Sequence, residues 1–404
     1  MARPTKKAFA LAGSALLIFL VGSNIQSGWL YVLGASMAGV VIAGLVIPSQ
    51  IVRRIEVRRK VPAAGRVGDP AEVTIEFQNL SSGSKSGMTG NDLFMGGERF
   101  VIENLAGGST LKIPYSIELT RRGVYEDAPL VLETRFPFGV GIARRRVDVV
   151  SRMIVHPRWA VLNGFPLLEA ASSPNEPFHD RRRRGAGFEF FGIREHRAGD
   201  SLRHVHWRSS ARTGRLLVRE YEDQPASRMG VWIDSGPTVG KEPHTAFEDA
   251  VSCAASLVNY ALDVGHPAQL FCDTKRGTEH LFEPGRNDML DWLAGLEADG
   301  RRGLSRTAEE MIGEVQSRST HVLIFPTTER CVEEVPAAIG VIQGASARVI
   351  VVAVSASSYA KAPGTLPEDR EDKFLTGIAS NRVIVYRVSH GREIGDCLAD
   401  PYLS

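Results

Sequence analysis

The most restrictive feature of the sequence is a run without any charged side chain, which extends from Ala8 to Val52. One bilayer crossing needs about 20 apolar residues, so a run of this length suits two crossings. Polar, turn-forming residues at 23–28 divide the run. We therefore predict two membrane-spanning helices within residues 1–52, over about 9–22 and 29–47, with the first one short for a bilayer.

Basic residues flank both outer ends of this predicted hairpin. Arg3, Lys6 and Lys7 precede it, Arg53 and Arg54 follow it, and the connecting tip has none. Because basic residues are enriched on the cytoplasmic side, we expect a multi-pass protein of the cell membrane with its soluble domains in the cytoplasm. A cleaved signal peptide is the alternative, and the second apolar run argues against it.

Residues 53–158 show the pattern of β-strands. Val73, Ile75 and Phe77 alternate with polar side chains, and a period of two indicates strands with one buried face. Gly- and Ser-rich breaks separate several short runs of this kind. We predict a small β-sandwich-like domain.

Residues 230–404 change to the pattern of an α/β domain. Short, continuous apolar runs alternate with segments of helical periodicity, which indicates a mainly parallel sheet covered by helices on both faces. The predicted strands lie at 230–235, 268–274, 321–328, 347–355 and 381–389, and the predicted helices at 245–264, 287–296, 307–317 and 332–342. Ligands of such folds bind at the carboxyl ends of the strands, where the loops begin at Asp234, Asp273, Thr327 and Ser355.

The chain offers few residues for covalent chemistry. Its four cysteines are scattered without a CxxC pair or a zinc-site spacing, which is typical of reduced core residues. It has no Gly-x-Ser-x-Gly elbow. The loop at 236–242 has three rather than four residues between its glycines and ends in Lys-Glu, which excludes a phosphate loop. We therefore expect a protein that is not an enzyme and has no organic cofactor.

The loop after the first strand of the α/β domain could form a degenerate metal site, and this is the one cofactor hypothesis that remains open there. An Asp-x-Ser-x-Ser pattern there would hold a divalent cation such as Mg²⁺ through oxygen ligands. Here Asp234 and Thr238 keep an oxygen donor, whereas Gly236 has replaced the middle hydroxyl. The alternative is that Asp234 caps the turn that follows.

Between the two domains, residues 159–186 are a predicted linker, because prolines break them and they contain the run Arg181–Arg184. Residues 187–229 then predict a strand, a turn, a short helix and a second strand. Asp200 is the expected N-cap of that helix and Gly214 its expected end.

The segment from 181 to 222 holds eleven arginines against five acids. One interpretation is a structural clasp, in which arginine forks pair with the interleaved carboxylates and Trp207 is buried. The alternative is binding of nucleic acid or another anionic surface through residues 181–219. We favour the clasp, since no base-stacking platform is evident, and regard nucleic acid as an unlikely partner.

This segment resembles the signature of the domain of unknown function 58 family. The string from Gly187 through Gly-Ile-Arg-Glu at 192–195 fits in order, and so do later positions up to Val218. The signature and interaction residues on this resemblance are Arg194, Glu195, Gly199, Asp200, Arg203, Trp207, Arg212 and Glu220.

The resemblance implies a bacterial membrane protein that has a membrane α-hairpin, a β-rich region, the signature and an α/β von Willebrand factor type A-like (Rossmann-like) domain. It also implies partners such as a MoxR-type AAA+ ATPase and other membrane proteins, a role in the assembly of complexes, and no established activity. A type A domain normally binds a partner's acidic residue through its metal. On that pattern Asp234 and Thr238 match and Gly236 departs.

Three functions follow from these observations. The first is a membrane-anchored, non-enzymatic adaptor or assembly factor that presents its type A-like domain to other proteins. The second is a binder of nucleic acid through the arginine-rich segment. The third is a hydrolase with an unrecognised site near Asp234 and His206, which lacks an evident nucleophile and base.

Overall fold

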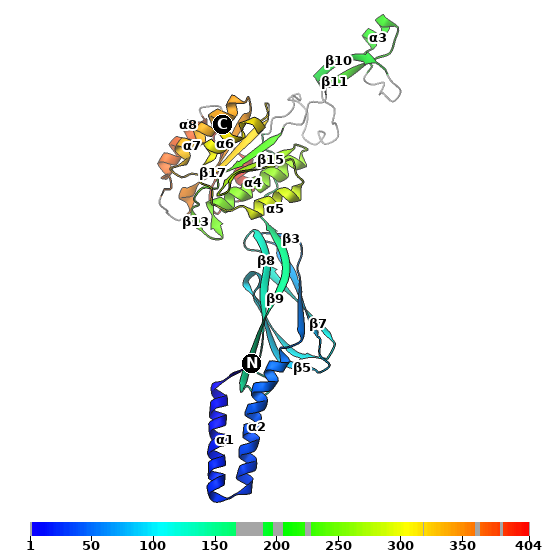
Figure 1. The fold of residues 1–404 in the computed structure, drawn as a ribbon. Coiled ribbons are helices and arrows are strands. Elements are labelled where there is room, and N and C mark those ends of the chain that lie inside the picture. The colour runs from blue at the N-terminus through cyan, green and yellow to red at the C-terminus, as the bar shows by residue number, and fades with distance from the viewer. Residues whose placement is uncertain are drawn as a thin grey trace. The chain divides into compact units, whose positions relative to one another are not determined.

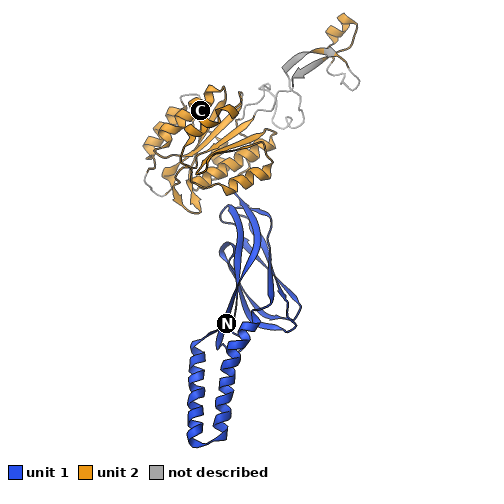
Figure 2. Cartoon of the chain, viewed as in Figure 1, with its two compact units in different colours: residues 1–156 blue, residues 157–404 orange. Residues whose placement is uncertain are grey.

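The computed structural model describes residues 2–166, 189–196, 205–222, 228–317, 319–359, 364–379 and 383–403. The chain forms two compact units, residues 1–156 and 157–404 (Figures 1 and 2). The first unit holds two apolar helices and a β domain. The second holds an α/β domain and a small hairpin.

The two N-terminal helices, α1 (Lys6–Ile25) and α2 (Gly28–Ile51), are long and apolar enough to cross a membrane. With 20 and 24 residues they measure about 30 and 36 Å at 1.5 Å per residue. Helix α1 is longer than the predicted span of 9–22, because residues 23–25 stay helical and the turn needs only Gln26 and Ser27. Small residues let the helices approach, since a Cβ on Gly22 would lie 2.9 Å from Leu30 Cβ.

Two sheets make up the β domain. One is antiparallel, in the order β2 (Ile55–Lys60), β4 (Pro70–Asn79), β7 (Thr110–Glu118). The other has the order β1 (Arg3–Pro4), β9 (Gly141–His156), β8 (Gly123–Thr134), β5 (Lys85–Asp92), β6 (Glu98–Leu105), and β3 (Ala64–Arg66) pairs with β9. Buried side chains from both sheets, among them Phe77 and Leu132, form one core cluster. The predicted sandwich and its alternating buried positions Val73, Ile75 and Phe77 are thus confirmed.

A fully buried ion pair lies inside this sandwich, and the sequence pattern did not reveal it. Arg59 of β2 donates from Nε to Asp92 Oδ2 at 2.9 Å, and both side chains are inaccessible to solvent. The hydroxyl of Tyr115 donates to the same Asp92 oxygen at 2.6 Å, and Arg59 also donates to Ser151 Oγ. Charges buried in this way are tolerated because nearly every donor and acceptor is paired.

The second unit is built on a six-stranded sheet. Its order is β16 (Gly277–Phe282), β15 (Ala268–Thr274), β12 (Met229–Ile233), β17 (Thr320–Pro326), β18 (Arg348–Val354), β19 (Ile384–Val388). Every neighbouring pair is parallel except β15 with β16. This confirms the predicted mainly parallel sheet, although β16, a half-exposed polar strand, was not predicted.

Helices cover both faces of this sheet. Alternate residues of β12 belong to different core clusters, since Val231 and Ile233 face one and Trp232 faces the other. The first cluster includes α4 (Ala246–Asp263), α5 (Arg286–Gly295) and α9 (Ile394–Ala399), and the second includes α6 (Leu304–Met311), α7 (Cys331–Gly344) and α8 (Glu368–Ala379). Helices α8 and α9 were not predicted.

The first residues of the predicted linker belong to this packed domain. Trp159, Leu162 and Phe165 contact the first cluster, and the ring of Phe165 stacks on that of Tyr386 at 5.2 Å between centroids. The prediction of a linker is therefore wrong for residues 159–166, because their apolar side chains cover the sheet. Residues 167–186, with Arg181–Arg184, lie outside the described residues.

Candidate functional site

The carboxyl ends of the parallel strands bring together residues that are far apart in the sequence. Ile233 pairs with Cys272 of β15 and with Ile324 of β17, so Asp234, Asp273 and the loop after β17 meet at one edge. The amide of Asp234 donates to Ile324 O at 2.9 Å. We call this group, with the loop 300–303 and the start of α7, the carboxyl edge.

Asp234 is a buried carboxylate at the centre of the carboxyl edge. Its Oδ1 accepts from the amide of Gly236 at 3.0 Å, which is the turn-capping role that the sequence offered as the alternative to metal binding. Burial raises its pKa above the ordinary value, and the carboxylates of Glu334 and Asp273 act in the same direction. The Gly236 amide and the Arg330 guanidinium oppose the shift.

Arg330, which the sequence analysis did not single out, lies at the point where the metal pattern has lost its middle hydroxyl. A Cβ on Gly236 would lie 2.9 Å from Arg330 Nη1 and 3.2 Å from Asp234 Oδ1. The absence of a side chain at 236 therefore leaves room for a guanidinium beside the carboxylate. Arg330 also approaches Glu334 at 3.4 Å and donates to Arg301 O at 3.1 Å, which holds it in place.

The oxygen ligands that a divalent cation needs are only partly present at this edge. Thr238 Oγ1 accepts from the Phe247 amide at 3.1 Å, at the start of α4. Within the described ranges, no group of three or more His, Cys, Asp or Glu side chains has a geometry that could hold a metal ion. A guanidinium beside Asp234 also repels a cation, so these residues fit the type A-like metal pattern poorly.

Asp273 lies next to the last residue of β15 and fixes the loop that follows α5. Its Oδ2 accepts from the amides of Arg302 and Gly303, while its backbone oxygen accepts from Ser235 Oγ. Its Oδ1 is buried and has no hydrogen-bond partner in the described part of the chain. Gly303 has φ +88°, and a Cβ there would collide with the Glu334 carboxylate. The sequence signal for this loop was the glycine pair in Asp-Gly-Arg-Arg-Gly at 299–303.

A second polar cluster closes the far side of the edge, after β18 and β19. The buried carboxylate of Glu371 accepts from Ser355 Oγ at 3.0 Å and from Ser357 Oγ at 3.1 Å, and it lies 3.0 Å from Arg387 Nε. Thr327 Oγ1 accepts from the amide of Ala356 at 2.8 Å. Sequence reasoning missed Glu371 because the charged helix α8 carries no clear apolar period.

The signature segment forms a hairpin of β10 (Glu189–Glu195) and β11 (Leu217–Glu222), with α3 (Trp207–Thr213) between them. Both predicted strands and the helix end at Gly214 are confirmed. The predicted N-cap is wrong, since α3 begins at Trp207 and His206 Nδ1 accepts from the Ser209 amide at 3.2 Å.

Trp207 is 65% exposed, so the prediction of a buried tryptophan is wrong. Glu195 pairs with Arg215 at 2.6 Å, as a clasp would require, but both are exposed, and such pairs contribute little to stability. Arg212 is exposed at the end of α3. Gly199, Asp200 and Arg203, together with the side chains of Arg194 and Glu220, lie outside the described residues.

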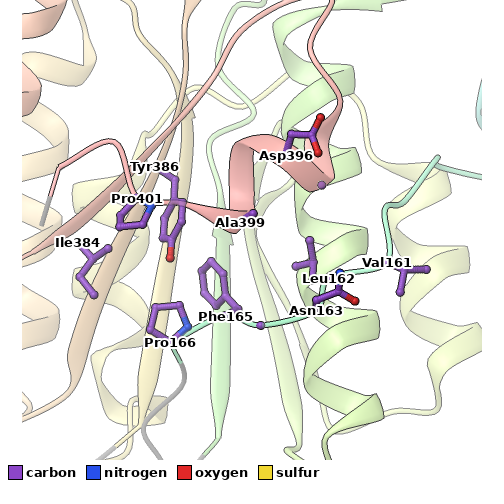
Figure 3. Close-up of a pocket in the computed structure, with 12 residues that line it drawn as sticks. Val161, Leu162, Asn163, Phe165, Pro166, Ile384, Tyr386, Asp396, Ala399 and Pro401 are labelled. Carbon is purple, nitrogen blue, oxygen red and sulfur yellow. The ribbon is translucent and has the colours of Figure 1, made fainter. Parts of the chain in front are cut away.

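A pocket of about 550 Å³ lies elsewhere on the second unit, between residues 161–166 and the β19–α9 region (Figure 3). The stacked rings of Phe165 and Tyr386 form part of its lining, and Asp396 is its one charged residue among those described. It shares no lining residue with the carboxyl edge. Apart from the Asp396 carboxylate and the Tyr386 hydroxyl, its described lining offers no group for acid–base or nucleophilic chemistry.

Residues 192–362 match the family described as "Protein of unknown function DUF58". The resemblance stated from the signature is therefore confirmed for these residues. The DUF58 match begins inside β10 and ends after β18, so it contains Asp234, Asp273 and Arg330. Both membrane helices, the sandwich, α8 and β19 lie outside it.

"Uncharacterized protein YeaD" of Bacillus subtilis (strain 168) is 25% identical over 159 residues, which are 39% of this chain and 37% of that protein. The chain thus matches less than half of the length of this relative. Among solved structures, the CARDB domain of PF1109 from Pyrococcus furiosus covers 24% of this chain and 94% of its own, at 17% identity and TM-score 0.18. Red sea bream transglutaminase covers 26% and 15%, at 16% identity and TM-score 0.20. TM-scores this low carry no argument about the fold.

Proposed function

We propose that the protein is a membrane-anchored, non-enzymatic adaptor or assembly factor, and that its carboxyl edge docks a partner such as a MoxR-type AAA+ ATPase. The observation that carries the proposal is the guanidinium of Arg330 beside Asp234, at the position where a type A-like domain would hold its metal. On this proposal a fixed cation of the protein replaces the metal ion.

The strand order supports the type A-like assignment of this domain. Numbered along the chain, the strands of the sheet run 3-2-1-4-5-6, which is the order of Rossmann-like folds that bind ligands at the carboxyl ends of their strands. The order reverses between β12 and β17. Asp234 directly follows β12, and Arg330 lies in the loop after β17. The proposed docking site is therefore at the switch point where such sheets bind.

The chemistry of Arg330 suggests what a partner would present. Its side chain is 29% exposed, so part of the guanidinium remains accessible. A guanidinium binds a carboxylate through two parallel hydrogen bonds, without a metal. We infer that the partner presents an acidic side chain to the solvent-exposed side of the Arg330 guanidinium, since the space between Arg330 and Gly236 is already filled.

The nucleophiles near this edge support a role without catalysis. Burial raises the pKa of Cys272 and of Cys331 to about 12, which keeps both thiols protonated. His321 lies in the core at the amino end of β17, away from the carboxyl edge. There its Nδ1 accepts from Trp232 Nε1 at 2.8 Å, and burial lowers its pKa to about 4. At the carboxyl edge Ser355 and Ser357 donate to the buried carboxylate of Glu371, which Arg387 Nε approaches at 3.0 Å. Among the described residues of this edge, no hydroxyl or thiol is hydrogen-bonded to a histidine ring as a general base.

Two apolar helices support anchoring in a membrane. The basic residues at their outer ends favour a cytoplasmic position for everything that follows. An ATPase of the MoxR type would then meet the carboxyl edge from the same compartment.

Site-specific photo-crosslinking in native membranes tests the proposed surface. A benzophenone side chain at Pro237, which is exposed beside Gly236, should crosslink to the MoxR-type ATPase of the same cell. The matched control is Val264, which is exposed at the opposite end of α4 and should give no such product. Equal crosslinking from both positions, or none from Pro237, would contradict the proposal.

A further inference from the structure

The turn that joins β8 and β9 packs against the second membrane helix. The amide of Thr5 donates to Val140 O at 2.9 Å, and its hydroxyl donates to Gly139 O at 3.1 Å. On the other side, a Cβ on Gly44 of α2 would lie 2.8 Å from Val140 Cβ. The turn is therefore held between the N-terminal strand and an apolar helix (Figure 1).

The level of this contact along the helices can be derived from the helix pairing. Gly22 faces Leu30, and Gly34 faces the backbone between Ala15 and Phe19. The same antiparallel offset brings Gly44 level with Lys7, next to the first charged residues of α1. If the two helices span a bilayer, as proposed above, the turn reaches the depth at which the apolar run gives way to charge.

Two large apolar side chains of this turn are partly exposed, although the ring of Phe136 also lies over Gly87 of β5. Phe136 is 45% exposed and Phe138 is 49% exposed. Arginines flank the turn on both sides: Arg135 directly precedes Phe136, and Arg144 follows in β9. Both are well exposed while they share the carboxylate of Glu133 at 3.1 and 2.6 Å. Aromatic rings beside arginines are the combination that membrane–water interfaces favour.

The sandwich is fixed to the end of α2, so it cannot carry the turn away from this depth. Lys85 Nζ donates to Ile51 O at 2.9 Å, and Arg145 Nη1 donates to Val52 O and Ile55 O, each at 3.1 Å. These cations satisfy carbonyls that the helix end would otherwise leave unpaired, and they favour the negative end of its dipole.

We propose that the turn Phe136–Gly139 inserts into the headgroup region of the bilayer, with its two phenylalanines among the upper acyl carbons and its arginines on lipid phosphates. This proposal rests on the proposed membrane anchoring. The sandwich then touches the membrane at two places, the helix pair and the turn, which sets its tilt with respect to the bilayer plane.

Fluorescence quenching in the reconstituted full-length protein tests the insertion. The native cysteines are all buried, so a Phe138→Cys variant takes an environment-sensitive label selectively. Lipids brominated near the ester end of their acyl chains serve as quenchers in nanodiscs. The matched control is Leu93→Cys, an exposed apolar position beyond the end of β5 that lies away from α2.

We expect at least threefold stronger quenching at 138 than at 93. A third label at Leu33, an exposed position within α2, distinguishes insertion of the turn from anchoring of the helices in the bilayer. Quenching at 33 with equal, weak quenching at 138 and 93 overturns the insertion and leaves the anchoring intact. No quenching at 33 overturns the anchoring itself. Shielding of position 138 in native membranes but not in pure lipid would assign the turn to a protein partner and would also overturn the proposal.

Discussion

Replacement of Gly44 by alanine should weaken the contact between α2 and the β8–β9 turn. The new Cβ would lie 2.8 Å from Val140 Cβ and 3.3 Å from Val140 Cγ1, well inside ordinary contact. The hydrogen bonds from Thr5 hold the turn in place, so it has little freedom to retreat. Overpacking of this kind costs about 1–3 kcal/mol.

Alanine also has a higher helix propensity than glycine, by up to about 1 kcal/mol, and this gain has to be separated from the overpacking. Gly39→Ala in the same helix provides the control, because a Cβ there would have nothing within 4 Å. Propensity cancels between the two variants. We therefore expect Gly44→Ala to be less stable than Gly39→Ala by about 1–3 kcal/mol.

The assay is reversible denaturation of the full-length protein in mild detergent micelles, followed by the circular dichroism of its strands. For a domain of this size the difference corresponds to a gap of roughly 5–20 °C between the melting temperatures of the two variants. The reasoning fails if Gly44→Ala is as stable as Gly39→Ala. It also fails if Gly44→Ala melts lower but the β8–β9 turn keeps the amide-exchange protection of the control.

Two further predictions concern buried charges. Asp92→Ala leaves Arg59 charged and unpaired inside the sandwich, so the unfolding free energy of the protein should fall by about 3–5 kcal/mol. The control Glu56→Ala, at an exposed ion pair, should lower it by less than about 1 kcal/mol. Similar losses in the two variants would contradict this prediction. Asp234 has a raised pKa, so its contribution to stability is complete below the unfolded pKa of about 4 and is lost as the pH rises through the folded pKa. Asp234→Asn, which keeps the acceptor for Gly236, should therefore unfold at higher denaturant concentration than wild type at pH 7 and at the same concentration below about pH 4; a difference that does not change with pH would refute the assignment.

The elements that sequence reasoning found are those whose burial is uniform along their length. Each of these elements has one kind of surroundings from end to end, so its sequence pattern is regular. Examples are the uncharged run, the alternation around Ile75 and the continuous apolar strands. Strand β16 and helix α8 are half-exposed and charged, and their patterns resemble those of loops. Residues 159–166 were misjudged because Pro166 and the prolines that follow at 174 and 177 indicated a linker, whereas the apolar side chains before Pro166 pack on the sheet.

The candidate site was predictable in position but not in composition. The ends of parallel strands pointed to Asp234 and Asp273 from the sequence alone. Arg330 could not be assigned, because only the pairing of β12 with β17 brings the start of α7 beside Gly236. Trp207 was expected in a core, yet it is exposed on the short helix α3.

The equilibrium affinity of the MoxR-type ATPase for the full-length protein in nanodiscs tests the central claim most directly. Wild type, Arg330→Gln and Arg286→Gln are compared with and without a chelator of divalent cations, since Arg286 is a similarly paired arginine at the opposite edge. The account predicts that Arg330→Gln weakens binding at least tenfold, because loss of a charge-assisted pair exceeds about 1.4 kcal/mol. It also predicts that neither Arg286→Gln nor the chelator changes the affinity more than about twofold. Binding that the chelator abolishes and Arg330→Gln leaves unchanged would contradict it.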